Sequence, residues 1–410
     1  MNSINYYFKL DYLAIILFSF FPILPNNIKG LPVVLLFLVT LYLYFTKKNK
    51  KIKYPIKKVL QFTSIYLILL ISLIFSDNFT HVDKQLSTRL SLLIVPISVG
   101  FLYSSGRKIS LRFFLRFIKI LLYVSTIFSF WILLLLFQLG VFSNSMSLYD
   151  AIAYITNEMW VISQHPIYAS IFIAISILLT IYLWFVIKKR HVILYTSPLV
   201  LLNLFTLLML ERRGVLLSFI LSLIIIIFSF IKTKVLNKSL KIFAVLSLII
   251  GFIFIISSNR FQELYQKKNY TNVIEFNSTS LRYGIYYCAL EKIKKSPLVG
   301  YGIGDVQIEL NKCYDNRSKF LTELTYNSHN QYLSYFLSSG IFGFLLLLFL
   351  LLRTAVDAIK NKNTLLLSIT VFFAINMLFE NILERQSGVV LFSFYICLFS
   401  FYNFSNMRKV

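Results

Sequence analysis

The sequence predicts an all-helical protein that crosses a membrane many times. Of its 410 residues, 58% are hydrophobic and only 14% are charged, whereas soluble domains carry about 25% charged residues. The apolar residues are gathered into long runs, and backbone groups inside lipid can satisfy their hydrogen bonds within a helix. This composition excludes a soluble enzyme, and it also excludes a disordered chain, which would need low hydrophobicity.

Twelve runs are candidates for membrane-spanning helices, which need roughly 17–25 apolar residues. We expect them at residues 12–28, 31–45, 59–75, 90–103, 120–139, 167–187, 192–210, 215–231, 242–256, 332–352, 364–382 and 389–404. The second, fourth and ninth are short and must extend into their flanks. The first contains Pro22 and Pro25 and is followed by no small-residue cleavage site, so we interpret it as mature structure rather than a signal peptide.

The charge of the chain predicts its orientation. Lysine and arginine number 41 against 16 aspartate and glutamate, a net charge of +25. In a soluble protein this excess would favour nucleic acid as a partner, but here it is concentrated in every second loop, most densely in residues 47–58 and 107–119. Such loops face the cytoplasm. We therefore expect both termini inside and no nucleic-acid partner.

This topology divides the chain into three parts: nine spans in residues 1–256, a long outer loop in residues 257–330, and three spans in residues 331–410. A loop of that length is usually functional. Its residues 281–295 have apolar side chains at helical spacing and are followed by Pro297 and a Gly-rich turn at 300–305. We expect a short helix there, either within the loop or flat on the membrane, and irregular structure with a short helix beyond it.

Cys288 and Cys313 share this loop. They would form a disulfide if the compartment is oxidising, and two free thiols are the other possibility.

Two adjacent arginines stand out in the outer turn between the seventh and eighth spans, where Glu211, Arg212, Arg213 and Gly214 follow one another. Their side chains would either reach the lipid headgroups, with Glu211 pairing one of them, or clamp a phosphate, because a guanidinium matches phosphate bidentately. In the second case Gly214 would permit a close approach of the backbone.

Two more candidates lie in the long loop. Arg282 stands at the start of the predicted helix, where backbone N–H groups can also bind an anion, although a solvated arginine is the simpler interpretation. His329 and Asn330 precede the tenth span. An imidazole with an ordinary pKa of about 6.5 can act as a base near neutral pH, whereas a lone histidine more often bonds to loop backbone.

A weaker set of polar residues flanks other spans, and we interpret its members as interfacial caps and ion pairs: Gln164, His165, Tyr168, Glu380, Glu384 and Arg385. The sequence contains no Walker loop, no Cys/His metal spacing and no nucleophile elbow. We therefore expect neither a metal nor a cofactor.

The order of these features over residues 210–406 resembles the O-antigen ligase and O-antigen polymerase family of bacterial inner-membrane glycosyltransferases. The resemblance is carried by Arg213-Gly214, then Arg282 with Tyr286 and Tyr287, Pro297 with Gly300, Gly302 and Gly304, and finally His329-Asn330 with Gly340-Ile341-Phe342-Gly343. The chain departs from the family in having tyrosine, where tryptophan is frequent, after the loop arginine. It also has Glu-Arg, where serine is frequent, before Arg213.

The resemblance implies a fold like the GT-C membrane glycosyltransferases, in the inner membrane with its site on the periplasmic face. The reaction would transfer a glycan from undecaprenyl pyrophosphate to an acceptor hydroxyl without a metal, either on lipid A-core (ligase) or on another glycan (polymerase). Arg213 and Arg282 would bind the pyrophosphate and His329 would be the general base. We add as further candidates Arg212, Asn330, His165, Tyr168 and Glu384.

Two other classes of function remain possible from the sequence alone. A transporter or flippase of lipid-linked glycans would suit twelve spans, but transporters place polar residues near the middle of the membrane, and here they collect at the outer face. A structural partner in polysaccharide assembly would need no reactive residues.

Overall fold

The structure, a computed structural model, describes residues 10–25, 28–46, 53–107, 109–143, 145–158, 165–187, 189–231, 273 and 278–404. Within these ranges all regular structure is helical, which confirms the predicted all-α class. Seven of the described helices are long and apolar enough to cross a membrane. They are α3 (Ile56–Ser72) with η3 (Leu73–Phe75), α4 (Val82–Arg89) with α5 (Ser91–Ser104), α6 (Leu111–Gln138), α8 (Pro166–Ile187), α9 (Arg190–Met209), α10 (Arg213–Ile231) and α16 (Gln331–Lys360).

Four shorter apolar helices occupy four more of the predicted spans: α1 (Leu10–Ile16) with η1 (Leu17–Ile23), α2 (Leu31–Thr46), α17 (Thr364–Asn376) and α18 (Gln386–Phe401). The predicted ninth span, residues 242–256, lies outside the described residues, so the count of twelve stays a prediction. Several boundaries differ from the predicted ones: the fourth and fifth spans begin earlier, at Val82 and Leu111, and the tenth continues to Lys360. The first span ends at Ile23 after a 3-10 turn that contains Pro22, because proline lacks a backbone donor, and the eleventh ends at Asn376.

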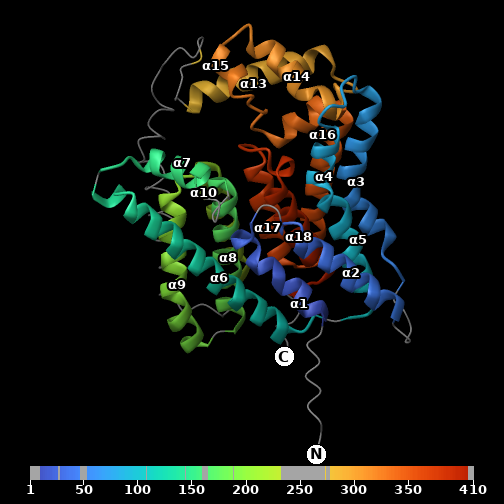
Figure 1. The fold of residues 1–410 in the computed structure, drawn as a ribbon. Coiled ribbons are helices and arrows are strands. Elements are labelled where there is room, and N and C mark those ends of the chain that lie inside the picture. Colours follow the sequence, from blue (N-terminus) through green and yellow to red (C-terminus); the bar gives the residue numbers. More distant parts are fainter. Residues whose placement is uncertain are drawn as a thin grey trace, which may run out of the picture.

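The helix α18 is the centre of the bundle and is buried along nearly its whole length. On one side it faces α5, which packs on α2 and α3, and on the other side α17 packs on α10. The helices α6, α8, α9 and α10 form a second group beside α17 (Figure 1). The helix α7 (Leu148–Glu158) follows α6 at the edge of this group. Buried small side chains on α8 and α18, such as Ala174, Ser176 and Ser393, allow neighbouring helices to pack closely around them.

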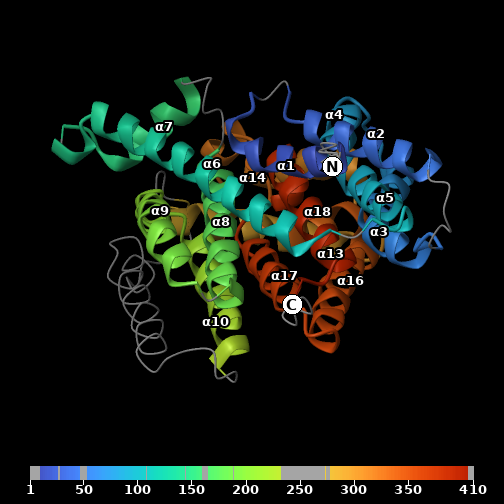
Figure 2. The ribbon, with the colours of Figure 1, turned by 90° about the horizontal axis from the view of Figure 1, so that it is seen from below.

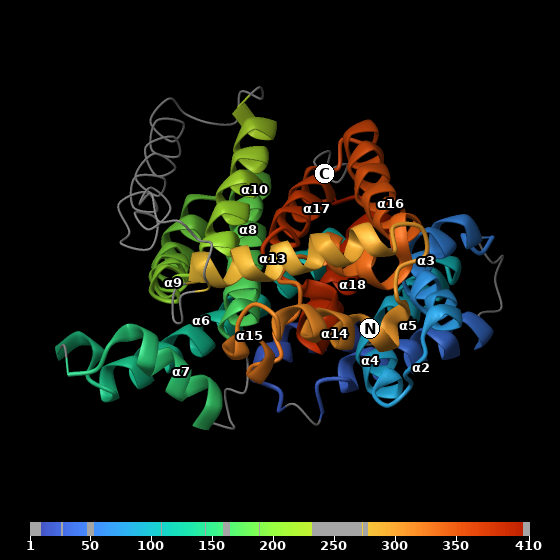
Figure 3. The same ribbon diagram turned by 90° about the horizontal axis from the view of Figure 1, so that it is seen from above.

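Three helices form a cap over one end of the bundle: α13 (Ser278–Lys295), α14 (Gly302–Tyr314) and α15 (Lys319–Glu323) (Figures 1 and 3). The cap has its own apolar core, in which Ile285 and Ala289 of α13 pack with Leu310 and Tyr314 of α14. The expected helix at residues 281–295 is confirmed by α13. The segment beyond Pro297 is more helical than we expected, since the Gly-rich turn leads directly into α14.

A disulfide joins the two main helices of the cap. It links Cys288 of α13 to Cys313 of α14, with 5.7 Å between the Cα atoms. Both cysteines belong to the apolar core of the cap. Of the two possibilities that the sequence left open, the structure therefore contains the disulfide.

The cap is anchored to the membrane helices by two interlocking glycines. The helix α16 is kinked at Gly340, whose φ is +62°, and a Cβ atom there would lie 2.0 Å from the carbonyl oxygen of Leu298. Gly300, with a φ of +72°, approaches the carbonyl of Leu337 in the same way. The backbone N–H of Tyr301 donates to that carbonyl at 2.8 Å. Only residues without a side chain allow this contact.

Gly340→Ala should destabilise the protein by roughly 2–5 kcal/mol, because alanine is strained at a positive φ and its methyl group would overlap backbone. Thermal unfolding of the purified protein in detergent measures this loss. The matched control is Gly30→Ala, where an added Cβ would have its nearest contact at an ordinary 3.5 Å. Equal melting temperatures for the two variants would contradict the interlock.

Candidate active site

The segment between α17 and α18, residues 377–385, is largely buried although most of it is not helical, and only Leu378 and Arg385 in it are exposed. It contains one short 3-10 turn, η6 (Ile382–Glu384), and Met377, Ile382 and Leu383 are fully buried. Several of its backbone groups bond within local turns, and others bond to the start of α16. The Gln331 N–H donates to the Met377 carbonyl at 2.8 Å, and the Gln331 side-chain oxygen accepts from the Leu383 N–H at 2.5 Å. The segment is therefore held both by hydrogen bonds within its own turns and by these contacts with Gln331.

The loop before α16 extends this network. The side chains of Ser328 and Asn381 exchange hydrogen bonds at 3.1 and 3.2 Å. Asn330 caps α16 by accepting from the Tyr332 and Leu333 N–H groups, and its amide donates to the Leu378 carbonyl at 3.2 Å. In the structure Asn330 thus acts as the N-cap of α16.

Two tyrosines bring further helices to the same place. The Tyr286 hydroxyl of α13 lies 3.3 Å from the carbonyls of both His329 and Leu378. The Tyr168 hydroxyl of α8 donates to the Asn381 carbonyl at 3.5 Å. The cap, α8 and the start of α16 therefore converge on residues 377–385.

His329 faces Glu380 at the centre of this convergence. The histidine has a φ of +44°, which is uncommon for a residue other than glycine, and its N–H donates to the Asn327 side chain at 3.1 Å. Its Nδ1 lies 3.2 Å from Glu380 Oε2, and the two side chains are 25% and 11% exposed. The unusual backbone is tolerated where it directs the imidazole toward the carboxylate.

The charge state of Glu380 decides the tautomer of His329. Burial alone would raise the pKa of Glu380, but the hydrogen bond and charge of His329, together with His165 and Arg282, lower it below the ordinary value. An ionised carboxylate only accepts hydrogen bonds. The His329 Nδ1 must therefore carry a proton, and Nε2 keeps its lone pair when the ring is neutral.

The predicted phosphate-binding arginines lie around this pair. Arg282 is one helical turn before Tyr286 on α13. Burial raises the pKa of Tyr286, the charge of Arg282 opposes that change, and Glu380 reinforces it. Arg213 begins α10, where an added Cβ on Gly214 would lie 2.9 Å from the Cβ of Phe379. The start of α10 therefore packs against the residue next to Glu380.

His165 precedes α8 and belongs to the same cluster. Burial lowers its pKa to about 4. The charge of Glu380 opposes this, while Arg385, Arg212 and His329 contribute to the lowering. Its ring lies 6.1 Å from that of Tyr168. His165 is therefore neutral near pH 7. His165 and Tyr168, two members of the weaker set of polar residues, both lie beside the predicted site.

Glu384 has a different role from Glu380. It lies 3.8 Å from Arg89 of α4 and accepts hydrogen bonds from Asn327, at 3.1 Å, and from Ser334. It thus holds the loop that carries His329 without contacting the imidazole. Sequence reasoning placed Glu380 only among caps and ion pairs. The sequence did contain an indication of its role, because Glu380 is a carboxylate in a short polar segment between two apolar runs.

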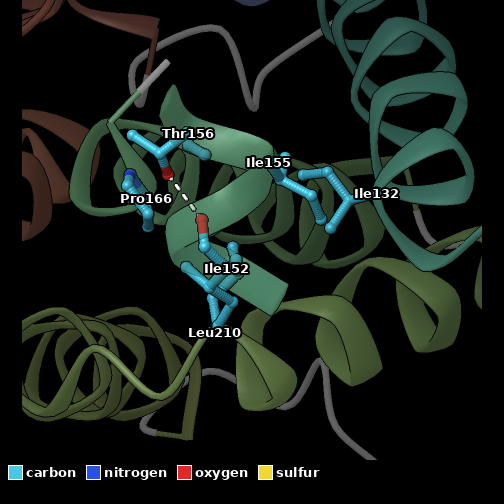
Figure 4. A pocket seen from close by; sticks show the side chains of 7 residues that line it. Ile132, Ile152, Ile155, Thr156, Pro166 and Leu210 are labelled. Atoms are coloured by element: carbon cyan, nitrogen blue, oxygen red, sulfur yellow. Dashed lines mark hydrogen bonds between the residues drawn. The ribbon is translucent and has the colours of Figure 1, made fainter. Parts of the chain in front are cut away.

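The described residues contain no group of three or more His, Cys, Asp and Glu that could hold a metal. Close to His165 lies a small apolar cavity of about 20 Å³ between α6, α7 and α8, lined by Ile132, Ile152, Pro166 and Leu210 among others (Figure 4). A cavity of this size has room for about one water. The charged cluster, and not this cavity, is therefore the candidate site.

These observations define an all-helical membrane protein with a cluster of ionisable residues beneath a helical cap. Residues 198–348, from α9 to α16, match the model of a family described as O-Antigen ligase. The resemblance drawn from the motifs is confirmed. Arg213, Arg282 and His329 lie inside the matched segment, whereas His165 and Glu380 lie outside it.

The chain is also similar to an uncharacterized protein of Haemophilus influenzae (strain ATCC 51907 / DSM 11121 / KW20 / Rd). The two are 31% identical over 144 residues, which cover 33% of this chain and 36% of that protein. The match therefore spans only about a third of the length of either protein.

The cluster should make the stability of the protein depend on pH. The unfolded chain protonates His165 near its ordinary pKa of about 6.5, whereas the folded protein does so only near 4. The unfolded state therefore binds more protons between these values, and stability should fall as the pH is lowered from 6.5 toward 4, by on the order of 1–3 kcal/mol.

Melting temperatures at pH 7 and pH 5 measure this dependence. His165→Gln should lose part of the difference, and the exposed His191→Gln should keep it. If the wild-type protein and His165→Gln respond equally to acid, the burial of a neutral His165 is refuted.

Proposed function

We propose that the protein transfers a glycan from an undecaprenyl-pyrophosphate donor to an acceptor hydroxyl on the periplasmic face of the bacterial inner membrane. The observation that carries the proposal is the contact between His329 and Glu380. Arg282 is close enough for its charge to lower the pKa of Glu380. The imidazole of His329, oriented by Glu380, would supply a base, and the guanidinium of Arg282 would offset the negative charge of the leaving group. The family match over residues 198–348 supports the same reaction.

His329 would act as the general base. As the acceptor oxygen attacks the anomeric carbon, its proton passes to the free Nε2 of His329. The carbon–oxygen bond to the pyrophosphate breaks on the opposite side, and the lipid pyrophosphate leaves with the electron pair. The configuration at the sugar is thereby inverted. The imidazolium that forms is stabilised by the carboxylate of Glu380, which also fixes the ring orientation.

The arginines would offset the charge that develops on the leaving pyrophosphate. Arg213 and Arg282 are the main candidates, and Arg212 lies near enough to influence His165. Fixed cations directed at a developing negative charge are an effective source of catalysis. The first turn of α10 adds the positive end of a helix dipole at the same place.

The cap would shield the reaction from water, because α13 contributes both Arg282 and Tyr286 to the site. A closed site limits hydrolysis of the donor. The disulfide between Cys288 and Cys313 fits an oxidising compartment such as the periplasm. This agrees with the orientation predicted from the loop charges.

A polymerase of the same family would use the same donor and differ in its acceptor, a second glycan in place of lipid A-core. A ladder of products from a defined donor identifies the polymerase, and a single transfer identifies the ligase. A flippase is less well supported, because the charged cluster is at the capped end of the helices and not near their middle.

His329→Ala should lower the transfer rate by about 10²–10⁴-fold, because the acceptor loses its base. The initial rate is measured in proteoliposomes with a defined lipid-linked donor and acceptor. His191→Ala, an exposed histidine at the start of α9, is the matched control and should keep the wild-type rate. Wild-type turnover by His329→Ala would disprove the assignment.

In the same assay Glu380→Gln separates positioning from proton transfer. Glutamine still accepts from Nδ1–H but no longer carries a charge to stabilise the imidazolium. We expect kcat to fall by less than in His329→Ala while KM for the donor changes little. A purely structural role would instead lower the amount of folded protein and leave its kcat unchanged.

Arg282→Lys keeps the charge but loses the planar fork that matches phosphate. We expect kcat/KM for the donor to fall about tenfold to a hundredfold, the cost of one charged hydrogen bond. Arg213→Lys should behave in the same way, and the exposed Arg116→Lys serves as the control. Unchanged kinetics in both site variants would eliminate the clamp.

A further inference from the structure

A second, larger cavity lies far from the candidate active site. Its volume is about 510 Å³, and it is lined by the first turns of α3 and α17 and by the ends of α16 and α18. The helix α16 lies next to both α3 and α17 (Figure 2). On α16 the cavity begins at Arg353, whereas the site begins at Gln331. At about 1.5 Å per residue the two are roughly 30 Å apart.

The charged lining of this cavity has an excess of cations. Lys57, Lys58 and Arg353 face a single carboxylate, that of Asp357, whose Oδ2 lies 3.4 Å from the Arg353 Nε. The Arg353 side chain is 51% exposed, and Lys57 is exposed as well. Two cations are therefore accessible to a ligand.

Lys58 forms part of the cavity wall. Its Nζ donates to the Ser400 carbonyl at the end of α18 and lies 4.9 Å from the centre of the Phe401 ring. This lysine thus neutralises the negative end of α18. At the same time α3 and α17 begin at the cavity, so the positive ends of two helix dipoles add to the cations.

The surroundings of the cavity favour a lipid. Phe62, Leu366 and Phe401 give it an apolar side. On the same stretch of α16, Leu352 and Ile359 are 57% and 62% exposed, as expected for side chains that face acyl chains. Amide groups of Gln61 and Asn361 also line it and can bond to headgroup hydroxyls.

We propose that this cavity binds the phosphate group of an anionic phospholipid. Basic pockets between membrane helices on the cytoplasmic side are suited to acidic headgroups, and the loop charges predict that this end of the bundle is cytoplasmic. The cavity is distinct from the glycan-transfer site, and the inference does not depend on the proposed reaction.

The test compares lipids on the purified full-length chain in a neutral detergent. Phosphatidylglycerol should bind and raise the melting temperature, and phosphatidylcholine at equal concentration should not. Each removed cation should weaken phosphatidylglycerol binding about fivefold. Lys57→Gln with Arg353→Gln should therefore weaken it roughly twenty-fivefold in a lipid titration followed by native mass spectrometry.

The control is Lys360→Gln with Lys362→Gln, which removes the same charge at the same end of α16 from residues outside the cavity lining. This variant should bind phosphatidylglycerol like the wild-type protein. If the cavity variant fails to fold, the single Lys57→Gln in the exposed first turn of α3 should still show the fivefold loss.

A separate arm with inorganic phosphate identifies the source of the phosphate group. Stabilisation by millimolar phosphate, lost in the cavity variant, combined with equal binding of phosphatidylglycerol and phosphatidylcholine would assign the cavity to a free anion and overturn the lipid proposal. The proposal is overturned if phosphatidylglycerol binds no better than phosphatidylcholine, or if the cavity and control variants weaken binding equally.

Discussion

The candidate site depends on how the buried segment 377–385 satisfies its backbone polar groups. An unpaired peptide group away from water costs about as much as a lost hydrogen bond, and this segment is mostly not helical. Gln331 pairs with Met377 and Leu383, and Asn330 pairs with Leu378. Because these bonds hold the start of α16 in one register against the segment, they also bring His329 to Glu380.

The electrostatics of the cluster follow from that contact. A carboxylate as buried as Glu380 is costly to ionise unless cations or hydrogen bonds compensate, and here the hydrogen bond with His329 and the charge of Arg282 do so. The nearby guanidinium groups, those of Arg212, Arg282 and Arg385, outnumber this carboxylate. A site with surplus cations, with a neutral His165 that adds none, is complementary to an anionic substrate. The proposed pyrophosphate donor has that property.

The local patterns of the sequence predicted the helices, their orientation and the arginine and histidine candidates. Each of these features depends on residues that are close together along the chain. Apolar periodicity located α8, α16 and α18, and the residues before α16 indicated His329. The pairing of Glu380 with His329 was missed, since it joins residues 51 positions apart. The end of α17 at Asn376 was missed as well, because the turns that follow it are stabilised partly by the distant Gln331.

The roles of Gly300 and Gly340 depend on a contact between two segments that are distant in the sequence. In the sequence, Gly300 belongs to a Gly-rich turn and Gly340 to the glycine motif after His329-Asn330. In the structure, a side chain on either glycine would overlap the backbone of the other's segment. Their contact fixes the cap on the kink of α16, nine residues beyond Gln331. Since α13 carries Arg282 and Tyr286, a shift of the cap at this kink would move both away from His329. The backbone contact at the kink is therefore a requirement of the site as much as of the fold.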